Sequence, residues 1–178
     1  MHPGRPPAAL PDCRLYAHKR PPKAVTPPSC RESTMSTETN TAQLQRLADE
    51  VLTGHNLAAL DEIFHADYVE DEPPPGMGPG RDGLRQWLAS WIAAFPDVRW
   101  TVEEQIADED RVWSRSIWQG THQGSFLGIP PTGKGVTVAA WTIDRFTDGK
   151  IAESRIIMDT LGMMQQLGVI PAPGAPTP

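Results

Sequence analysis

The sequence predicts an α+β domain in which helices of the first half pack on one face of an antiparallel sheet formed by the second half. Apolar residues recur at helical spacing between residues 44 and 95, then alternate with polar residues from Val98 onward. The dipeptide Asp148-Gly149 between two alternating runs is typical of a two-residue hairpin turn. A run of helices followed by a strand meander indicates this fold class, because the helices can cover one face of the sheet.

Three helices are expected before the sheet. Gly54 is placed to end the first, Asn56 can cap the second, and Pro96 stops the third. Three consecutive prolines at 73–75 exclude a helix there and follow a short extended piece at 68–72. The expected helices are 44–52, 57–64 and 81–95.

The alternating pattern predicts four strands and a final helix. A loop rich in Gly and Pro between residues 124 and 133 separates the second strand from the third. Asp159 can cap the final helix, and Gly168 can end it. The expected strands are 98–103, 111–120, 136–147 and 150–158, and the final helix is 160–167.

The two ends of the chain are expected to be disordered tails. Residues 1–34 contain eight prolines and no periodic apolar pattern, so they cannot bury enough surface to offset the entropy lost on ordering. Their composition favours an upstream start codon, with Met35 as the first translated residue, over a functional basic tail. We expect one domain at 35–170 and a second tail at 171–178.

Composition excludes several classes of function. Residues 1–34 hold six Lys or Arg against two acidic residues, whereas the remaining 144 residues hold 10 against 20. An acidic body argues against nucleic acid or an anionic membrane as a partner, and no apolar run approaches the roughly 20 residues of a spanning helix. Both cysteines, Cys13 and Cys30, lie in the expected tail, which leaves the domain without a thiolate metal site. We expect a cytoplasmic protein that needs no metal or cofactor.

Both faces of the longest expected strand are apolar. Val138, Thr142 and Asp144 share one face, whereas Trp141 and Ile143 share the other. The helices can cover one face only, so the second face is expected to be the interface of a homodimer. The alternative is that its apolar residues are scattered and exposed, as on many monomers.

Three stretches of the sequence resemble one known family. Residues 120–134 are similar to the run GTHxGxFxGxxPTGK of SnoaL-like polyketide cyclases, also called ester cyclases. Residues 148–153 resemble the DGKIxE hairpin of that family, and residues 159–168 resemble its DxLGxxxQLG helix. With 80–81 and 94–97, the resemblance covers about residues 44–170 in the family's order and spacing.

The resemblance implies a nuclear-transport-factor-2-like cone, in which three helices and a curved, mostly antiparallel sheet enclose a pocket. Family members with assigned chemistry close polyketide rings without a cofactor. They remove an α-proton from a methyl ester and complete an intramolecular aldol condensation. The implied ligand is a small apolar or aromatic molecule. The family's catalytic Asp and its assisting His correspond to Ile156 and Thr142 here, so the usual acid/base pair is replaced.

Asp144 is the first candidate for a substitute base. It lies two residues beyond Thr142 and therefore faces the same expected pocket, where burial would raise its pKa. The alternative is an ion pair with Arg115 or Arg155 on a neighbouring strand.

His122 in the Gly-rich loop is the second catalytic candidate, although it can equally hold the loop backbone. Acidic residues 70–72 are expected to form a solvated edge rather than a cation site. The residues expected to contact a substrate are Thr142, Ser154, Ile156, Trp118 and Phe126.

Three functions fit these residues. The first is a cyclase with a relocated base. The second is a module that binds a small molecule without converting it, which the loss of the Asp/His pair favours. The third is a dehydratase or hydrolase in the same cone, because a fold alone does not define a reaction.

Overall fold

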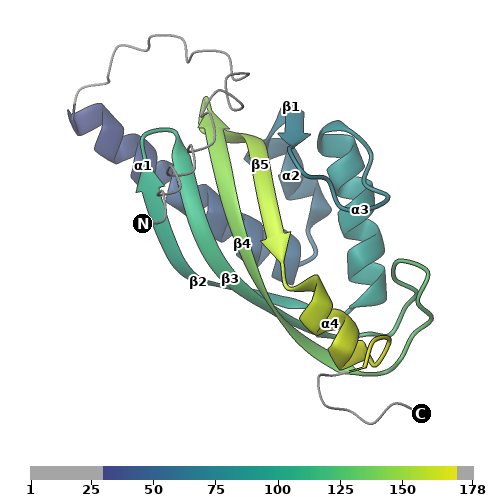
Figure 1. The fold of residues 1–178 in the computed structure, drawn as a ribbon. Coiled ribbons are helices and arrows are strands. Elements are labelled where there is room, and N and C mark those ends of the chain that lie inside the picture. Colours follow the sequence, from purple (N-terminus) through teal and green to yellow (C-terminus); the bar gives the residue numbers. More distant parts are fainter. Residues whose placement is uncertain (1–29, 172–178) are drawn as a thin grey trace, which may run out of the picture.

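The computed structural model describes residues 30–171 and shows helices packed against a curved sheet (Figure 1). The first helix begins at Cys30, inside the segment 1–34 that the sequence indicated as a tail. The remainder of the two expected tails, apart from residue 171, lies outside the described residues. No helix within 30–171 is long and apolar enough to cross a membrane.

The elements follow the predicted order with one addition. The first predicted helix is the end of a longer one, which passes from α-helical to π-helical geometry after Arg46. The elements are α1 (Cys30–Arg46), η2 (Leu47–Thr53), η3 (Leu57–Ala59), α2 (Leu60–Ile63), β1 (Phe64–Glu70), α3 (Gly80–Ala94), β2 (Arg99–Asp108), β3 (Arg111–Thr121), β4 (Gly135–Thr147), β5 (Lys150–Met158) and α4 (Thr160–Leu167).

The sheet has five strands in the order β1-β5-β4-β3-β2. Strands β2 to β5 form the predicted antiparallel meander. The addition is β1, which pairs parallel with β5 and begins at Phe64, a residue that the sequence placed in the second helix. The α+β fold class is confirmed, and the sheet is mixed rather than a four-stranded meander.

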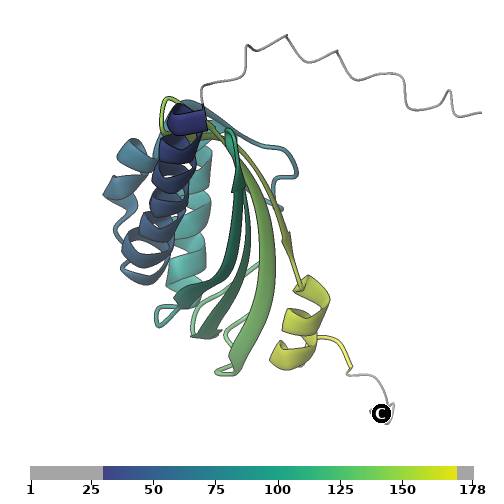
Figure 2. The same ribbon diagram turned by 90° about the vertical axis from the view of Figure 1, so that its left-hand side faces the viewer.

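Helices α1 to α3 lie on one side of the curved sheet, and α4 lies on the other side at one end (Figure 2). As predicted, the Asp159 side chain caps α4 by accepting a hydrogen bond from the Gly162 amide at 2.8 Å. Gly168 ends α4 in the left-handed conformation that favours glycine. Asn56 precedes the short helix η3 without a side-chain capping bond, so that expected cap is not formed.

Aromatic rings fill one part of the space between the helices and the sheet. Trp91 and Phe95 of α3 meet Trp118 of β3 edge-on, with ring centroids 5.1 and 5.2 Å apart. Phe126, from the loop after β3, packs edge-on against Phe95 at 5.4 Å. Such edge-on pairs match the positive edge of one ring to the negative face of another. Packed aromatic rings therefore fill this part of the interior.

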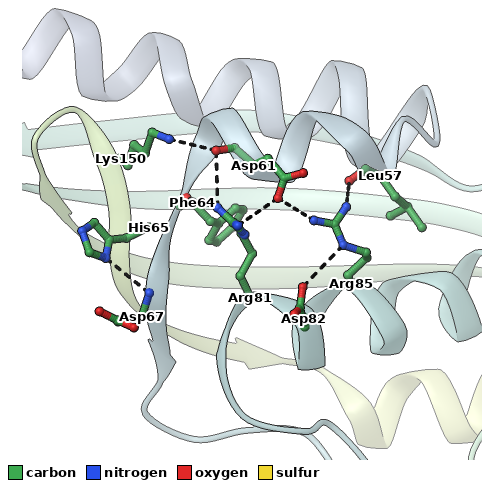
Figure 3. A network of polar contacts seen from close by, with 9 residues as sticks. All are labelled: Leu57, Asp61, Phe64, His65, Asp67, Arg81, Asp82, Arg85 and Lys150. Atoms are coloured by element: carbon green, nitrogen blue, oxygen red, sulfur yellow. Dashed lines mark hydrogen bonds and ion pairs between the residues drawn. The ribbon is translucent and has the colours of Figure 1, made fainter.

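A polar network fixes the start of β1 (Figure 3). Arg81 and Arg85 of α3 both bind the Asp61 carboxylate, at 3.0 and 2.7 Å. Arg81 also donates to the Phe64 carbonyl at 3.2 Å, and Lys150 donates to the Asp61 carbonyl at 2.8 Å. These bonds satisfy carbonyl groups that the end of α2 leaves without a helical partner. They connect α2, α3 and the β4–β5 hairpin at the point where β1 begins.

The outer face of the sheet carries large exposed apolar side chains. Ile106, Ile143 and Ile157 are 60%, 45% and 58% exposed, and Trp141 is half-buried. The alternation on β4 is as predicted, because Val138, Ala140 and Asp144 are buried on the opposite face. Homodimerisation through the outer face stays a prediction.

Replacing Ile157 with Glu is expected to convert a dimer into a monomer, because a charge in the centre of an apolar interface would lose its hydration. Light scattering coupled to size-exclusion chromatography gives the mass directly. The matched control is Leu127→Glu, which changes an exposed leucine in the loop between β3 and β4. A monomeric parent protein at all concentrations would contradict this prediction.

Candidate functional site

A pocket of about 100 Å³ lies between the helices and the concave face of the sheet. By this measure one water needs roughly 10–15 Å³, so the pocket has room for a small organic group. Its wall is mostly apolar and includes three tryptophans, which suit a flat ring system. Prominent apolar lining residues are Leu44, Leu52, Trp87, Trp91, Trp100 and Met158.

Polar side chains are gathered on the sheet side of this pocket. Glu70 of β1 pairs with Ser154 of β5, which in turn pairs with Asp144 of β4. The neighbouring row places Ser114 of β3 opposite Thr142 of β4. Residues opposite one another in adjacent strands project to the same face, and all five line the pocket. The strand register therefore concentrates two carboxyl groups and three hydroxyl groups in one place.

The Asp144 carboxylate is held by two hydroxyl groups. Thr142 donates to Oδ2 at 2.7 Å and Ser154 donates to Oδ1. The Thr142 hydroxyl also shares a hydrogen bond of 2.8 Å with the Ser114 hydroxyl. Burial raises the pKa of Asp144 to about 6, against the lowering effect of the bonds from Ser154 and Thr142. The site thus contains a carboxyl group that titrates near neutral pH.

Asp144 forms no ion pair with any residue of the described chain. Arg115 instead binds Glu103, and Arg155 binds Asp71. Both arginines point to the outer face, where Arg115 is paired with Trp141 and Arg155 with Ile143. The ion-pair alternative raised by the sequence is therefore not what the structure shows.

Glu70 is the residue of the site that the sequence reading missed. The Tyr68 hydroxyl donates to its Oε2 at 2.8 Å, and its Oε1 is buried without a hydrogen-bond partner among the described residues. Burial raises the pKa of Glu70 to about 7, and the charge of Asp144 adds to the rise. The expected solvated edge at 70–72 is wrong for this residue, since Asp71 and Glu72 alone reach Arg155 outside. Alternation from Tyr68 to Glu70 was the signal available in the sequence.

The expected substrate contacts divide into two groups. Thr142, Ser154 and Ile156 line the pocket, and Thr142 is paired with Ile156 across β4 and β5. Thr142 and Ile156 are therefore neighbours on the pocket face. Trp118 and Phe126 do not line the pocket, because they pack into the aromatic part of the core around Phe95.

His122 is completely buried away from the pocket. Its ring stacks on Phe95 with centroids 5.1 Å apart, and its Nδ1 accepts from the Thr132 amide at 3.3 Å. Backbone bonds to Gly133 and Lys134 tie the same residue into the loop. Burial lowers the pKa of His122 and favours the neutral ring. The structure thus separates His122 from Asp144 and places it as a brace for the Gly-rich loop.

The sequence profile of the SnoaL-like polyketide cyclase family matches residues 42–167. The chain belongs to this family. Within residues 30–171, no group of three or more His, Cys, Asp or Glu side chains is arranged to hold a metal ion.

Curated relatives and solved structures agree with the family assignment. The chain is 30% identical to nogalonic acid methyl ester cyclase of Streptomyces nogalater over 61% of this chain and 83% of that protein. It is 26% identical to aklanonic acid methyl ester cyclase DnrD of Streptomyces peucetius over 68% and 88%.

Among solved structures, IdmH of Streptomyces antibioticus is 31% identical, with a TM-score of 0.64 and coverage of 72% of this chain and 98% of that one. TsrD of Streptomyces laurentii is 25% identical, with a TM-score of 0.69 and coverage of 75% and 97%. The structural similarity therefore extends over nearly the whole of both solved chains.

The raised pKa of Asp144 predicts that its ionisation destabilises the fold. The folded protein holds this proton up to about pH 6, whereas the usual value for Asp is 3.8, so the free energy of unfolding falls as pH rises through this interval. Asp144→Asn is expected to raise stability at pH 8 by at most about 3 kcal/mol, at roughly 1.4 kcal/mol per pKa unit, and by about half as much at pH 5.

Urea unfolding of the parent and of Asp144→Asn at both pH values measures this difference. Asp108→Asn, at the exposed end of β2, is the control for loss of one negative charge. An equal effect of Asp144→Asn at pH 5 and pH 8 would contradict the prediction.

Proposed function

We propose that this chain is a cofactor-free cyclase that closes a ring in a polyketide-like or aromatic ester, with Asp144 as the general base. The observation behind the proposal is a buried carboxyl group, without a cationic partner among the described residues, on the wall of an apolar pocket. The names of two relatives, both methyl ester cyclases, support the reaction class.

The reaction requires a base that is ionised near neutral pH and still basic enough to accept a proton from carbon. An ordinary aspartate is ionised but weakly basic, whereas a pKa of about 6 lies closer to the optimum for a general base. Asp144 takes the proton from the carbon between two carbonyl groups, and the C–H electrons form the enolate. The enolate carbon then attacks a ketone of the same molecule. One carbon–carbon bond forms, and the ketone π electrons move to its oxygen.

The surroundings of Asp144 suit this chemistry. Apolar walls exclude water, which strengthens electrostatic interactions within the pocket. The hydroxyl groups of Thr142 and Ser154 hold both carboxylate oxygens, so the base is kept in one orientation. Ser114 supports this orientation, because its hydroxyl shares a hydrogen bond with Thr142 while Thr142 donates to Asp144.

A binding protein is the second candidate function. One observation favours it, since Ile156 and Thr142 stand where the family has its Asp and His. Such a protein would hold the same class of ligand in the same pocket and leave it unchanged. The candidates differ in one measurable step, the removal of the α-proton.

The proposal predicts that the full chain catalyses deuterium exchange at the α-carbon of the methyl esters of nogalonic and aklanonic acid. Asp144→Asn is expected to slow this exchange by about 100-fold or more, the usual contribution of a general base. Proton NMR in deuterium oxide follows the exchange, and Asp108→Asn is the control. Saturable quenching of tryptophan fluorescence by the esters without exchange would overturn the enzyme and leave the binding protein.

A further inference from the structure

We propose that Glu70, positioned by Tyr68, is the proton donor that completes ring closure, two strands away from the base on the same face of the sheet. This inference rests on the proposed function, because it assigns the second proton transfer of the same reaction. It concerns a residue that the family's Asp/His positions, Ile156 and Thr142, do not include.

The strand register places Glu70 within reach of a substrate held by Asp144. Glu70, Ser154 and Asp144 occupy one row across three adjacent strands. Neighbouring strands lie about 5 Å apart, so the two acidic residues have backbones separated by about 10 Å. Both side chains line the pocket from this row. A substrate that lies over this row would have one carboxyl group near each end of it.

The hydrogen bonds of Glu70 identify the atom that holds the proton. Oε2 accepts from the Tyr68 hydroxyl, so it serves as an acceptor. Oε1 is buried with no partner among the described residues, and a buried polar atom without a partner costs roughly 1–3 kcal/mol. A proton on Oε1 makes that atom a donor, and a substrate oxygen in the pocket supplies its missing partner.

Burial and the charge of the neighbouring carboxyl group affect the protonation of Glu70 and Asp144. Burial raises the pKa of Glu70 most, and the charge of Asp144 on β4 adds to the rise. The Tyr68 hydroxyl and the backbone N–H groups of Glu72 and Ile156 act against it, because they stabilise the carboxylate. Arg155 lies outside, where it binds Asp71 and Glu72. Burial raises the pKa of Asp144 to about 6 and that of Glu70 to about 7, and the charge of Asp144 contributes to the rise at Glu70. Ionisation of one member of such a pair favours retention of the proton by the other, so the proposed base and acid share one proton near neutral pH.

The proton balance of an intramolecular aldol reaction fits this pair. Asp144 gains the proton from carbon, and the new alkoxide oxygen takes the proton from Glu70 Oε1. The substrate is isomerised without net gain or loss of atoms, and the enzyme is left with a protonated Asp144 and an ionised Glu70. Return of one proton from Asp144 to Glu70 restores the starting state. Ser154 stands between the two carboxyl groups in the row and donates to Asp144 Oδ1.

Two readouts on the full chain separate the donor from the base. In Glu70→Gln, α-deuterium exchange of the same methyl esters is expected to stay within about twofold of the parent, while ring closure slows by about 100-fold or more. The matched control is Glu72→Gln, which removes an exposed carboxylate two residues away and should leave both rates unchanged. Exchange is read by NMR, and ring closure by chromatography of the product.

The pH dependence of ring closure supplies a signature that a merely structural role would not produce. The rate of ring closure by the parent is expected to follow a bell-shaped pH profile, with limbs near pH 6 and pH 7. Asp144 must be ionised and Glu70 must be protonated for the reaction. Tyr68→Phe removes a bond that stabilises the Glu70 carboxylate, so the pKa of Glu70 rises and the alkaline limb moves to higher pH. This variant also tests the proposal if Glu70→Gln does not fold.

The outcomes distinguish the two proposals. A parent that exchanges deuterium and a Glu70→Gln variant that closes the ring at the parental rate would overturn the donor role and leave the base intact. Equal loss of exchange and ring closure in Glu70→Gln would also overturn it, because the residue would then act before ring closure. A parent without exchange would overturn the proposed function together with the donor role.

Discussion

The arrangement of the site depends on one constraint, which is that the concave face holds carboxyl groups and no positive charge among the described residues. Transfer of an ionised carboxylate from water into an apolar interior is strongly unfavourable unless hydrogen bonds or a cation compensate for it. Here the compensation comes from hydroxyl groups, and it is partial, because the pKa of Asp144 stays raised to about 6. Asp144 can therefore change between its protonated and its ionised form near neutral pH. The fold therefore retains a proton acceptor at the expense of some stability.

The separation of charge between the two faces of the sheet accounts for this constraint. Alternation along each strand sends Arg115, Arg145 and Arg155 to the outer face, and each binds an acidic residue there. The arginines of the strands that line the pocket are thus neutralised on the outer face of the sheet. Exposed pairs of this kind add little to stability. Their effect on the site is that no arginine of these strands reaches the concave face.

Much of this arrangement could be predicted from local sequence, and the rest required non-local pairing. Alternation in β4 placed Thr142 and Asp144 on the pocket face, and the Asp148-Gly149 turn pairs Thr147 with Lys150. A register shift between Arg145 and Phe146 then brings Ser154, rather than Glu153, opposite Asp144. By contrast, β1 reaches its place through parallel pairing with β5, across about 80 residues of chain. No turn sequence predicts this parallel pairing, because the two strands are far apart in the chain. Glu70 was consequently assigned to a solvated edge, and the sequence motif around His122 suggested catalysis where the structure shows a loop brace.

The position of the acids within the pocket follows from the geometry of a sheet. Thr142 and Ile156 form one row, and Asp144 and Ser154 form the next row on the same face. A shift of two residues along a strand moves a side chain by roughly 7 Å without changing the face to which it points. A carboxyl group can therefore be relocated within the cone while the fold and its apolar wall stay the same. The addition of β1 next to β5 extends the new row by one position, and Glu70 occupies that position. A base and an acid on one row of a curved sheet both face the enclosed pocket, so the curvature of the sheet directs the two groups toward a common substrate.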